Sequence, residues 1–388
     1  MNNREILQAV KDEMALISGD MKKLALKIWE NPETAWNEVE SSKLVCQFLE
    51  DNAIPVERGI CGIPTAFRGE VENGPGAVFA FAAEYDALPV GHACGHNLIA
   101  AASSGAVCAA SRVAKKLGIP GKLVILGTPA EEAGNAKVSM TEKGVLNGID
   151  AVMMAHPGWC TIPDRGSLAI RRYDVTFHGK SSHAAGSPEL GINALDAVML
   201  LFSGVSFFRQ QMPEFCRIHG IVREGGKAPN IIPADASCRF YLRSAKEEWM
   251  EKLDQRFDEM VRGAALMTGC SYDKEKLSVD CKSRKPNSFL NDLYVEAMQE
   301  QGETISPVPA SGRASSDFGN FSHVIPAAHP YFSIADTRIG AHSAEFKECA
   351  RSGKGLENMV KAAIALAYTA CCFLDSTVLR ENVKKDFQ

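Results

Sequence analysis

Residues 77–97, AVFAFAAEYDALPVGHACGHN, join an apolar run to a segment that is rich in metal-binding side chains. The run at 77–83 has the length and composition of a strand that is buried on both faces. Five side chains that can bind metal or carry protons follow it: Glu84, Asp86, His92, Cys94 and His96. We therefore expect a buried strand that leads directly into a functional site.

Short apolar strands alternate with helices on both sides of this segment. Helical periodicity marks residues 6–28 and 38–49, and a further helix is expected at 100–117. Strands are expected at 123–127 and 151–155. Alternation of this kind is typical of an α/β domain in which helices cover both faces of a mostly parallel sheet.

The middle of the chain has a different pattern. It predicts, in order, strand, helix, strand, strand, helix and strand at residues 167–177, 193–211, 218–223, 236–243, 246–267 and 270–279. This β-α-β-β-α-β order is the ferredoxin-like arrangement. We therefore expect an α/β domain formed by residues 1–166 and 283–388, interrupted by an inserted ferredoxin-like α+β domain at 167–282.

Composition excludes several classes of function. The chain has 388 residues, of which 46% are hydrophobic and 23% charged, as in a folded protein of about two domains. A net charge of −5 without clustered basic runs gives no reason to expect a nucleic acid as partner. The longest apolar run we identify, at residues 200–208, is too short for a membrane span, so no membrane partner is expected.

Cysteine usage bears on the compartment. The 12 cysteines are scattered singly, apart from Cys371 and Cys372, and do not form a disulfide-like framework. The charged N-terminal residues 1–14 lack the apolar core of a signal peptide. We therefore expect reduced thiols and a cytoplasmic protein.

Further polar side chains follow the other predicted strands. They lie in GTPAEEAG (127–134), MMAHPG (153–158) and GAHSAEF (340–346), which contain Glu131, Glu132, His156 and His342. Because the carboxyl ends of parallel strands meet at one edge of a sheet, we expect these side chains to gather there. Two adjacent acids at a buried strand end need a cation or a shared proton.

Cys94 and His96 stand two positions apart, so an extended segment would point both to the same side. The small neighbours Gly91, Ala93 and Gly95 let the backbone approach the site. A mixture of nitrogen, sulfur and oxygen ligands suits Zn²⁺, with Mn²⁺ or Co²⁺ as alternatives where carboxylates dominate. The spacing therefore favours a metal site.

Taken in order, these motifs resemble a known family. EYDALPVGHACGHN, GTPAEEAG, MMAHP, GKSSHAA and AHSAEF are similar to the amidohydrolase branch of the aminoacylase and glutamate-carboxypeptidase metallopeptidases. That branch includes hippurate hydrolase, aminobenzoyl-glutamate hydrolase and the Xaa-Arg dipeptidases, and the first motif is most similar to the last two. NPETAWNE (31–38) and SSDFGNFSHVIPAAHPYF (315–332) extend the likeness over nearly the whole chain.

The resemblance implies two divalent metal ions and a lid domain that also forms a homodimer. It assigns five ligands, namely Cys94, His96, Glu132, His156 and His342. Cys94 stands where other branches have a bridging aspartate, and Glu84 stands where they have the first histidine ligand. His92 is not carried over as a ligand, and we expect it to have a structural role.

The resemblance also suggests a mechanism. Beside the metals, Glu131 would take a proton from metal-activated water and pass it to the leaving amine. Asp86 would orient a ligand imidazole. His183, in the predicted inserted domain, would polarise the scissile carbonyl in the active site of the other subunit. Asn230 and Arg313 are candidates for substrate binding.

These features predict a metal-dependent amidohydrolase or dipeptidase that acts on a small N-acyl amino acid or dipeptide. An aminobenzoyl-glutamate-type amidase is the alternative substrate class. Two other classes of protein compete with this hypothesis: a thiol hydrolase that uses Cys94 with His96 or His92, and a non-catalytic metal-binding protein.

Overall fold

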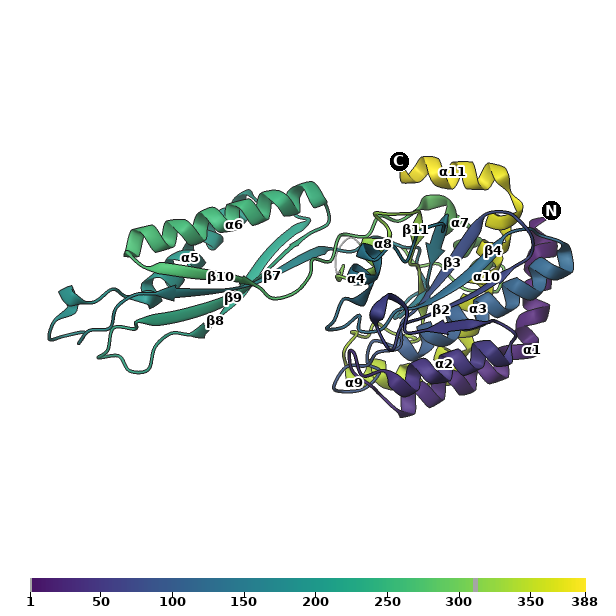
Figure 1. Cartoon of the computed structure of the whole chain (residues 1–388), viewed down its shortest axis with the longest axis horizontal. Helices are drawn as coiled ribbons and strands as arrows, with labels where there is room; N and C mark the ends of the chain where they lie inside the picture. The colour runs from purple at the N-terminus through teal and green to yellow at the C-terminus, as the bar shows by residue number, and fades with distance from the viewer. Residues whose placement is uncertain (1, 310–312) are drawn as a thin grey trace. The chain divides into compact units, whose positions relative to one another are not determined.

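The computed structural model describes residues 2–309 and 313–388, which divide into two compact units. Unit 1 comprises Met1–Gly166, Lys285–Arg313 and Asp317–Gln388. Unit 2 comprises Ser167–Arg284 and the short segment Ala314–Ser316. The second unit is therefore inserted into the first (Figure 1).

Helices in unit 1 are α1 (Asn3–Glu30), α2 (Val39–Asp51), α3 (His96–Leu117), α4 (Ala136–Glu142), α7 (Ser288–Gln299), α8 (Phe318–Phe321), α9 (Ala344–Cys349), α10 (Gly353–Asp375) and α11 (Thr377–Phe387). Its strands are β1 (Val56–Arg58), β2 (Phe67–Glu72), β3 (Val78–Ala83), β4 (Lys122–Gly127), β5 (Ala151–Met153), β6 (His156–Gly158), β11 (Ala327–Ala328) and β12 (Tyr331–Ser333), with the 3-10 turn η1 (Ile60–Gly62).

The main sheet of unit 1 has the strand order β1-β2-β4-β3-β5-β11. Strands β4, β3, β5 and β11 run parallel to one another, whereas β1 and β2 form an antiparallel edge. β12 and β6 pair in parallel as a separate two-stranded sheet. The prediction of a mostly parallel α/β sheet is therefore confirmed.

Both faces of this sheet are buried. In β3, Phe79 and Phe81 point into one core with α1, α3 and α10. Ala80 and Ala82 alternate with them and point into a second core, which includes α8. The apolar run at the start of the site segment is thus a strand with no solvent-facing side, as its composition predicted.

One helix in the described part of the chain, α10, is long and apolar enough to cross a membrane. Of its most apolar stretch 78% is buried, and α10 packs against α3, α1 and α7. The expectation that residues 200–208 form the longest apolar run is therefore wrong. The core position of α10 accounts for its composition, since a helix that is apolar all round is typical of a protein interior.

Unit 2 contains β7 (Ala169–His178), η2 (Pro188–Leu190), α5 (Ala194–Phe208), η3 (Arg209–Gln211), β8 (Cys216–Glu224), β9 (Asp235–Ser244), α6 (Glu247–Thr268) and β10 (Ser271–Lys276). Its four strands form an antiparallel sheet in the order β10-β7-β9-β8. α5 and α6 pack on each other and on β7 and β9 (Figure 1). This is the predicted β-α-β-β-α-β arrangement.

Candidate metal centre

The centre lies where three neighbouring parallel strands end. β4, β3 and β5 are adjacent in the sheet. Glu84 directly follows β3, and Glu131 and Glu132 lie in the turn after β4. His156 comes three residues after β5 and opens β6. The polar clusters predicted at strand ends therefore meet at one edge of the sheet.

Cys94 and His96 come together by a different route from the expected one. His96 is the first residue of α3, and Gly95 caps this helix with a left-handed φ of 76°. The segment is thus a tight turn into a helix, and the expectation of an extended segment is wrong. A Cβ at position 95 would lie 2.6 Å from Pro157 Cγ, so both the backbone angle and the space require glycine here.

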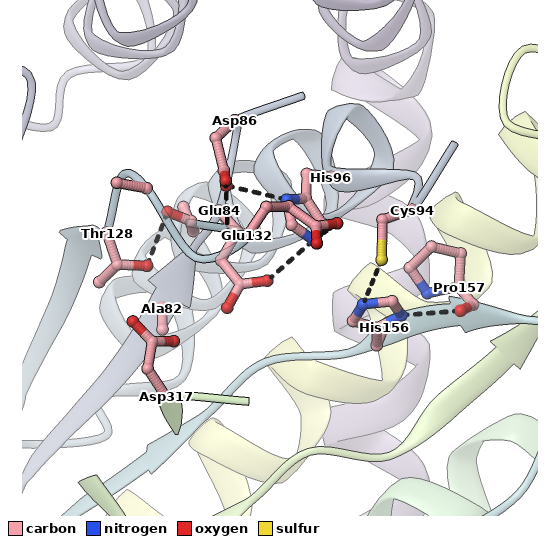
Figure 2. A network of polar contacts seen from close by, with 12 residues as sticks. Ala82, Glu84, Asp86, Cys94, His96, Thr128, Glu132, His156, Pro157 and Asp317 are labelled. Carbon is pink, nitrogen blue, oxygen red and sulfur yellow. Dashed lines mark hydrogen bonds and ion pairs between the residues drawn. The ribbon is translucent and has the colours of Figure 1, made fainter. Parts of the chain in front are cut away.

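Three overlapping groups of possible ligand atoms result, and within each group all atoms lie within 4.8 Å of one another. The first group is Cys94, His96 and His156, the second is Cys94, Glu132 and His342, and the third is His96, Glu131 and Glu132. Cys94 thus belongs to two groups and lies between them (Figure 2). This arrangement brings together all five residues that the resemblance assigned as ligands.

Hydrogen bonds orient two of the imidazoles for metal binding. His96 Nδ1 lies 2.9 Å from Asp86 Oδ1, and His156 Nδ1 lies 2.7 Å from the Pro157 carbonyl oxygen (Figure 2). Because each acceptor holds the proton on Nδ1, the lone pair of each ring is on Nε2. His156 Nε2 lies 3.7 Å from Cys94 Sγ. Both rings therefore turn their basic nitrogen toward the centre.

Asp86 links the two halves of the centre. Besides contacting His96, its Oδ2 accepts a hydrogen bond from the backbone N–H of Glu132 at 2.9 Å. Asp86 is buried, which raises the pKa of its carboxyl, but His96 outweighs this effect and the pKa is lowered. The carboxylate is therefore charged and fixed between the two ligand-bearing segments.

We expect the Asp86→Asn variant to bind metal about 10- to 100-fold more weakly, because outer hydrogen-bond partners of this kind orient the ligands. Competition with a chromogenic chelator would measure the affinity. The matched control is Asp150→Asn, whose carboxylate also accepts a backbone N–H, from Val78, away from the centre. An unchanged affinity in Asp86→Asn would contradict the role of this carboxylate.

The adjacent glutamates differ in electrostatic environment. Burial raises the pKa of Glu131 well above its usual value, and Glu84, Asp317 and Glu132 raise it further. Burial also acts on Glu132, but the hydrogen bond from His342 and the charge of His96 outweigh it and lower its pKa. One carboxyl thus favours a proton, and its neighbour stays ionised, as a base and a ligand require.

The environment of Cys94 argues against the thiol hydrolase. Burial, reinforced by the charge of Glu132, raises the pKa of the Cys94 thiol. His156 is its nearest imidazole, rather than the His96 or His92 that the sequence suggested. A thiol with a raised pKa is a poor nucleophile, whereas a divalent ion would stabilise the thiolate as a ligand.

Unsatisfied polar atoms show that the donor set fits a cation. His96 Nε2 and Glu132 Oε1 are buried and have no hydrogen-bond partner in residues 2–309 and 313–388. They lie 3.9 Å apart, and His342 Nε2 lies 3.4 Å from the same glutamate oxygen. Buried groups of this kind are costly unless a partner compensates them, and a metal ion is such a partner.

Four other predicted residues lie outside these groups. His92 is buried, and its burial lowers the pKa of the ring to about 4, so the ring is neutral at neutral pH. Arg313 is an exposed residue of unit 1. His183 and Asn230 are exposed residues of unit 2, where the Asn230 carbonyl accepts a hydrogen bond from the N–H of Ala184.

Sequence reasoning did not single out two further buried acids or a buried lysine. Lys137, in α4, forms ion pairs with Glu84 and Asp317. Burial lowers the pKa of its ammonium, but the two carboxylates raise it more strongly, so the lysine is charged. Glu38 accepts hydrogen bonds from the N–H groups of Trp36 and Ala130, both at positive φ. Glu38 thus holds the turn that carries Glu131 and Glu132.

The fold and the donor set define a metal-dependent hydrolase built on a parallel α/β sheet. The profile of peptidase family M20/M25/M40 matches residues 78–370. The chain belongs to this family. The match begins at β3 and ends within α10, so it spans every residue of the candidate metal centre.

Curated relatives and solved structures agree with this membership. The Xaa-Arg dipeptidase of Mus musculus is 37% identical over 94% of this chain and 88% of its own length. A p-aminobenzoyl-glutamate hydrolase polypeptide of Escherichia coli (strain K12) is 31% identical over 77% of this chain and 66% of its own length. A dinuclear metal binding peptidase from the M20 family of Bacillus subtilis shares the fold, with a TM-score of 0.75, 19% identity and coverage of 93% and 99%.

Proposed function

We propose that this protein hydrolyses the amide or peptide bond of a small dipeptide or N-acyl amino acid. Cys94, His96, Glu132, His156 and His342 hold two divalent ions in this proposal. The observation that carries it is the overlap of ligand groups around Cys94, next to a carboxyl whose pKa is raised, that of Glu131. Zn²⁺ suits a set with one thiolate and three imidazoles, and Mn²⁺ or Co²⁺ are the alternatives.

Bound divalent ions supply Lewis acidity, which polarises an amide carbonyl and makes water acidic enough to react near neutral pH. Glu131 then accepts the proton of the attacking water and delivers it to the leaving nitrogen. Its position supports this role, because its carboxylate shares a group with His96 and Glu132. Its raised pKa also brings it nearer to neutral pH, where proton transfer in both directions is efficient.

His183 supplies a hydrogen bond to the developing oxyanion in this proposal. Its Nδ1 accepts hydrogen bonds from the backbone N–H groups of Ala185 and Gly186, at 3.2 and 3.0 Å. The proton of the neutral ring must therefore be on Nε2, which makes this exposed nitrogen a donor. A donor of that kind can stabilise negative charge on a carbonyl oxygen.

The protein forms a homodimer through unit 2 in this proposal, so that His183 of one copy serves the metal centre of the other. β8 is an edge strand, and among the described residues it pairs only with β9. Ile221 and Val222 on β8 are exposed, as is Phe207 on α5. Open strand edges and exposed apolar side chains together favour pairing with a second copy of the same surface.

Changing this surface should separate the subunits. We expect Ile221→Lys combined with Phe207→Lys to weaken dimerisation by at least ~30-fold, since a central interface side chain contributes about 2 kcal/mol or more. Sedimentation velocity at several concentrations measures the change. Leu266→Lys on α6, at an equally exposed apolar position, is the control and should remain dimeric. Equal behaviour of both variants would contradict this interface.

The substrate class is proposed from the relatives. The Xaa-Arg dipeptidase is similar over most of both chains, so a dipeptide with a basic C-terminal residue is the first candidate. Aminobenzoyl-glutamate-type amides are the second. In either case Asn230 and Arg313 bind the polar or anionic end of the substrate. All 12 cysteines in the described residues are free thiols, which supports a reducing compartment such as the cytoplasm.

A substrate panel tests this function directly. Chelator-stripped protein is reconstituted with Zn²⁺, Mn²⁺ or Co²⁺ and assayed on Xaa-Arg dipeptides, N-acyl amino acids and aminobenzoyl-glutamate. We expect hydrolysis that depends on added metal, with the highest kcat/KM for one of the dipeptides. Activity that survives complete removal of metal would contradict the proposal.

A further inference from the structure

Lys137 is a fully buried lysine beside the metal centre. Its Nζ lies 2.7 Å from Glu84 Oε1 and 2.7 Å from Asp317 Oδ1, and its backbone N–H donates to Asp317 Oδ2 at 3.0 Å. A buried ammonium is costly unless it is paired, and here two carboxylates compensate it. The lysine therefore has a fixed position rather than a choice of rotamers.

The surrounding carboxylates alone would form a cation site. Glu84, Glu131 and Asp317 each offer an oxygen, and these oxygens lie within 4.8 Å of one another. Three close and buried anions repel one another strongly and require positive charge among them. In this molecule the positive charge that contacts two of them comes from the chain itself, through Lys137.

Glu84 connects this cluster to the candidate ligands. Its Oε1 contacts Lys137, while its Oε2 lies 3.5 Å from His96 Nε2. Glu84 is 1% exposed, so it has no access to bulk water. The third carboxylate of the cluster, that of Glu131, is also the proposed base. The ammonium thus holds the carboxylates on the side of the centre opposite to Cys94 and His156.

We infer that the Lys137 ammonium is a tethered cation that occupies the acidic site formed by Glu84, Glu131 and Asp317. It thereby limits the number of divalent ions that the centre binds and positions Glu84 and Glu131. This inference rests on the metal centre of the proposed function. A lysine cannot dissociate or be chelated, so the charge at this position stays constant whatever metals are available.

Counting bound ions tests the inference. Lys137→Met removes the charge but keeps an unbranched side chain. After equilibrium dialysis against Mn²⁺, elemental analysis should find one more Mn²⁺ per chain in this variant than in the wild type. Lys143→Met is the matched control, because Lys143 follows the same helix and is exposed, with its Nζ on the Cys61 carbonyl. The control should bind the wild-type number of ions.

A second variant, Lys137→Gln, keeps a hydrogen-bond donor and should give the same additional ion. A wild-type ion count in both variants would overturn the inference. Failure of both variants to fold even in excess Mn²⁺ would also overturn it, because an ion able to take the place of the ammonium would restore the fold. If the wild type itself binds no divalent ion, the proposed metal centre is what fails, so the two failures are distinguishable.

Discussion

Glu131→Gln is expected to lower kcat by about 10³-fold while its metal content stays at the wild-type level. A positioned general base contributes about 10²- to 10⁴-fold to a rate, and an amide at this position cannot take a proton from water. KM should change little, because Glu131 acts on the proton rather than on substrate binding. Steady-state kinetics and elemental analysis of the same preparation measure both effects.

The neighbouring residue provides the control for this experiment. Glu132→Gln should lose metal, because Glu132 belongs to two ligand groups and contacts His342. The two substitutions are chemically identical and one position apart, so different effects on metal content would separate a base from a ligand. Hydrolysis by Glu131→Gln at the wild-type rate would remove Glu131 from the mechanism and would favour a non-catalytic role for this carboxylate.

His183→Ala should have the second largest effect, a loss of about 10²- to 10³-fold in kcat, which is typical for removal of one oxyanion donor. Metal content should be unchanged, since His183 belongs to unit 2 and to none of the ligand groups. Ser181→Ala, two residues earlier and also exposed, is the control and should keep wild-type activity.

Mixing two inactive variants tests whether His183 acts across the dimer. When Glu131→Gln and His183→Ala subunits exchange, each mixed dimer has one centre with an intact Glu131 that receives an intact His183 from the other copy. Roughly a quarter of wild-type activity should return, because half of randomly re-formed dimers are mixed and each has one complete site. No recovery despite demonstrated exchange would mean that His183 does not act in the other subunit.

The sequence predicted the fold well because its patterns are local. The apolar run at 77–83 and the alternation at 167–177 each report burial on two faces or on one, and periodicity alone distinguishes them. The resemblance of ordered motifs to a metallopeptidase family is confirmed by the family match. Those motifs also selected the side chains that the structure gathers at the ends of β3, β4 and β5.

Other features depend on backbone angles and distant contacts that spacing does not report. Two residues apart suggested an extended strand at Cys94 and His96, whereas the left-handed Gly95 turns the chain into α3. Nothing near Lys137 in the sequence indicates its burial, because its partners Glu84 and Asp317 come from segments on either side of unit 2 in the chain. Glu38 is likewise recognisable only through its contact with Ala130.

X-ray absorption at the zinc edge tests the central claim most directly, namely that Cys94 and the imidazoles and carboxylates of distant segments bind the same ions. Protein reconstituted with Zn²⁺ should show a sulfur ligand at about 2.3 Å together with nitrogen and oxygen ligands at about 2.0–2.2 Å. The sulfur signal should disappear in Cys94→Ser and persist in Cys160→Ser. Bound zinc with only nitrogen and oxygen ligands in the wild type would contradict the account.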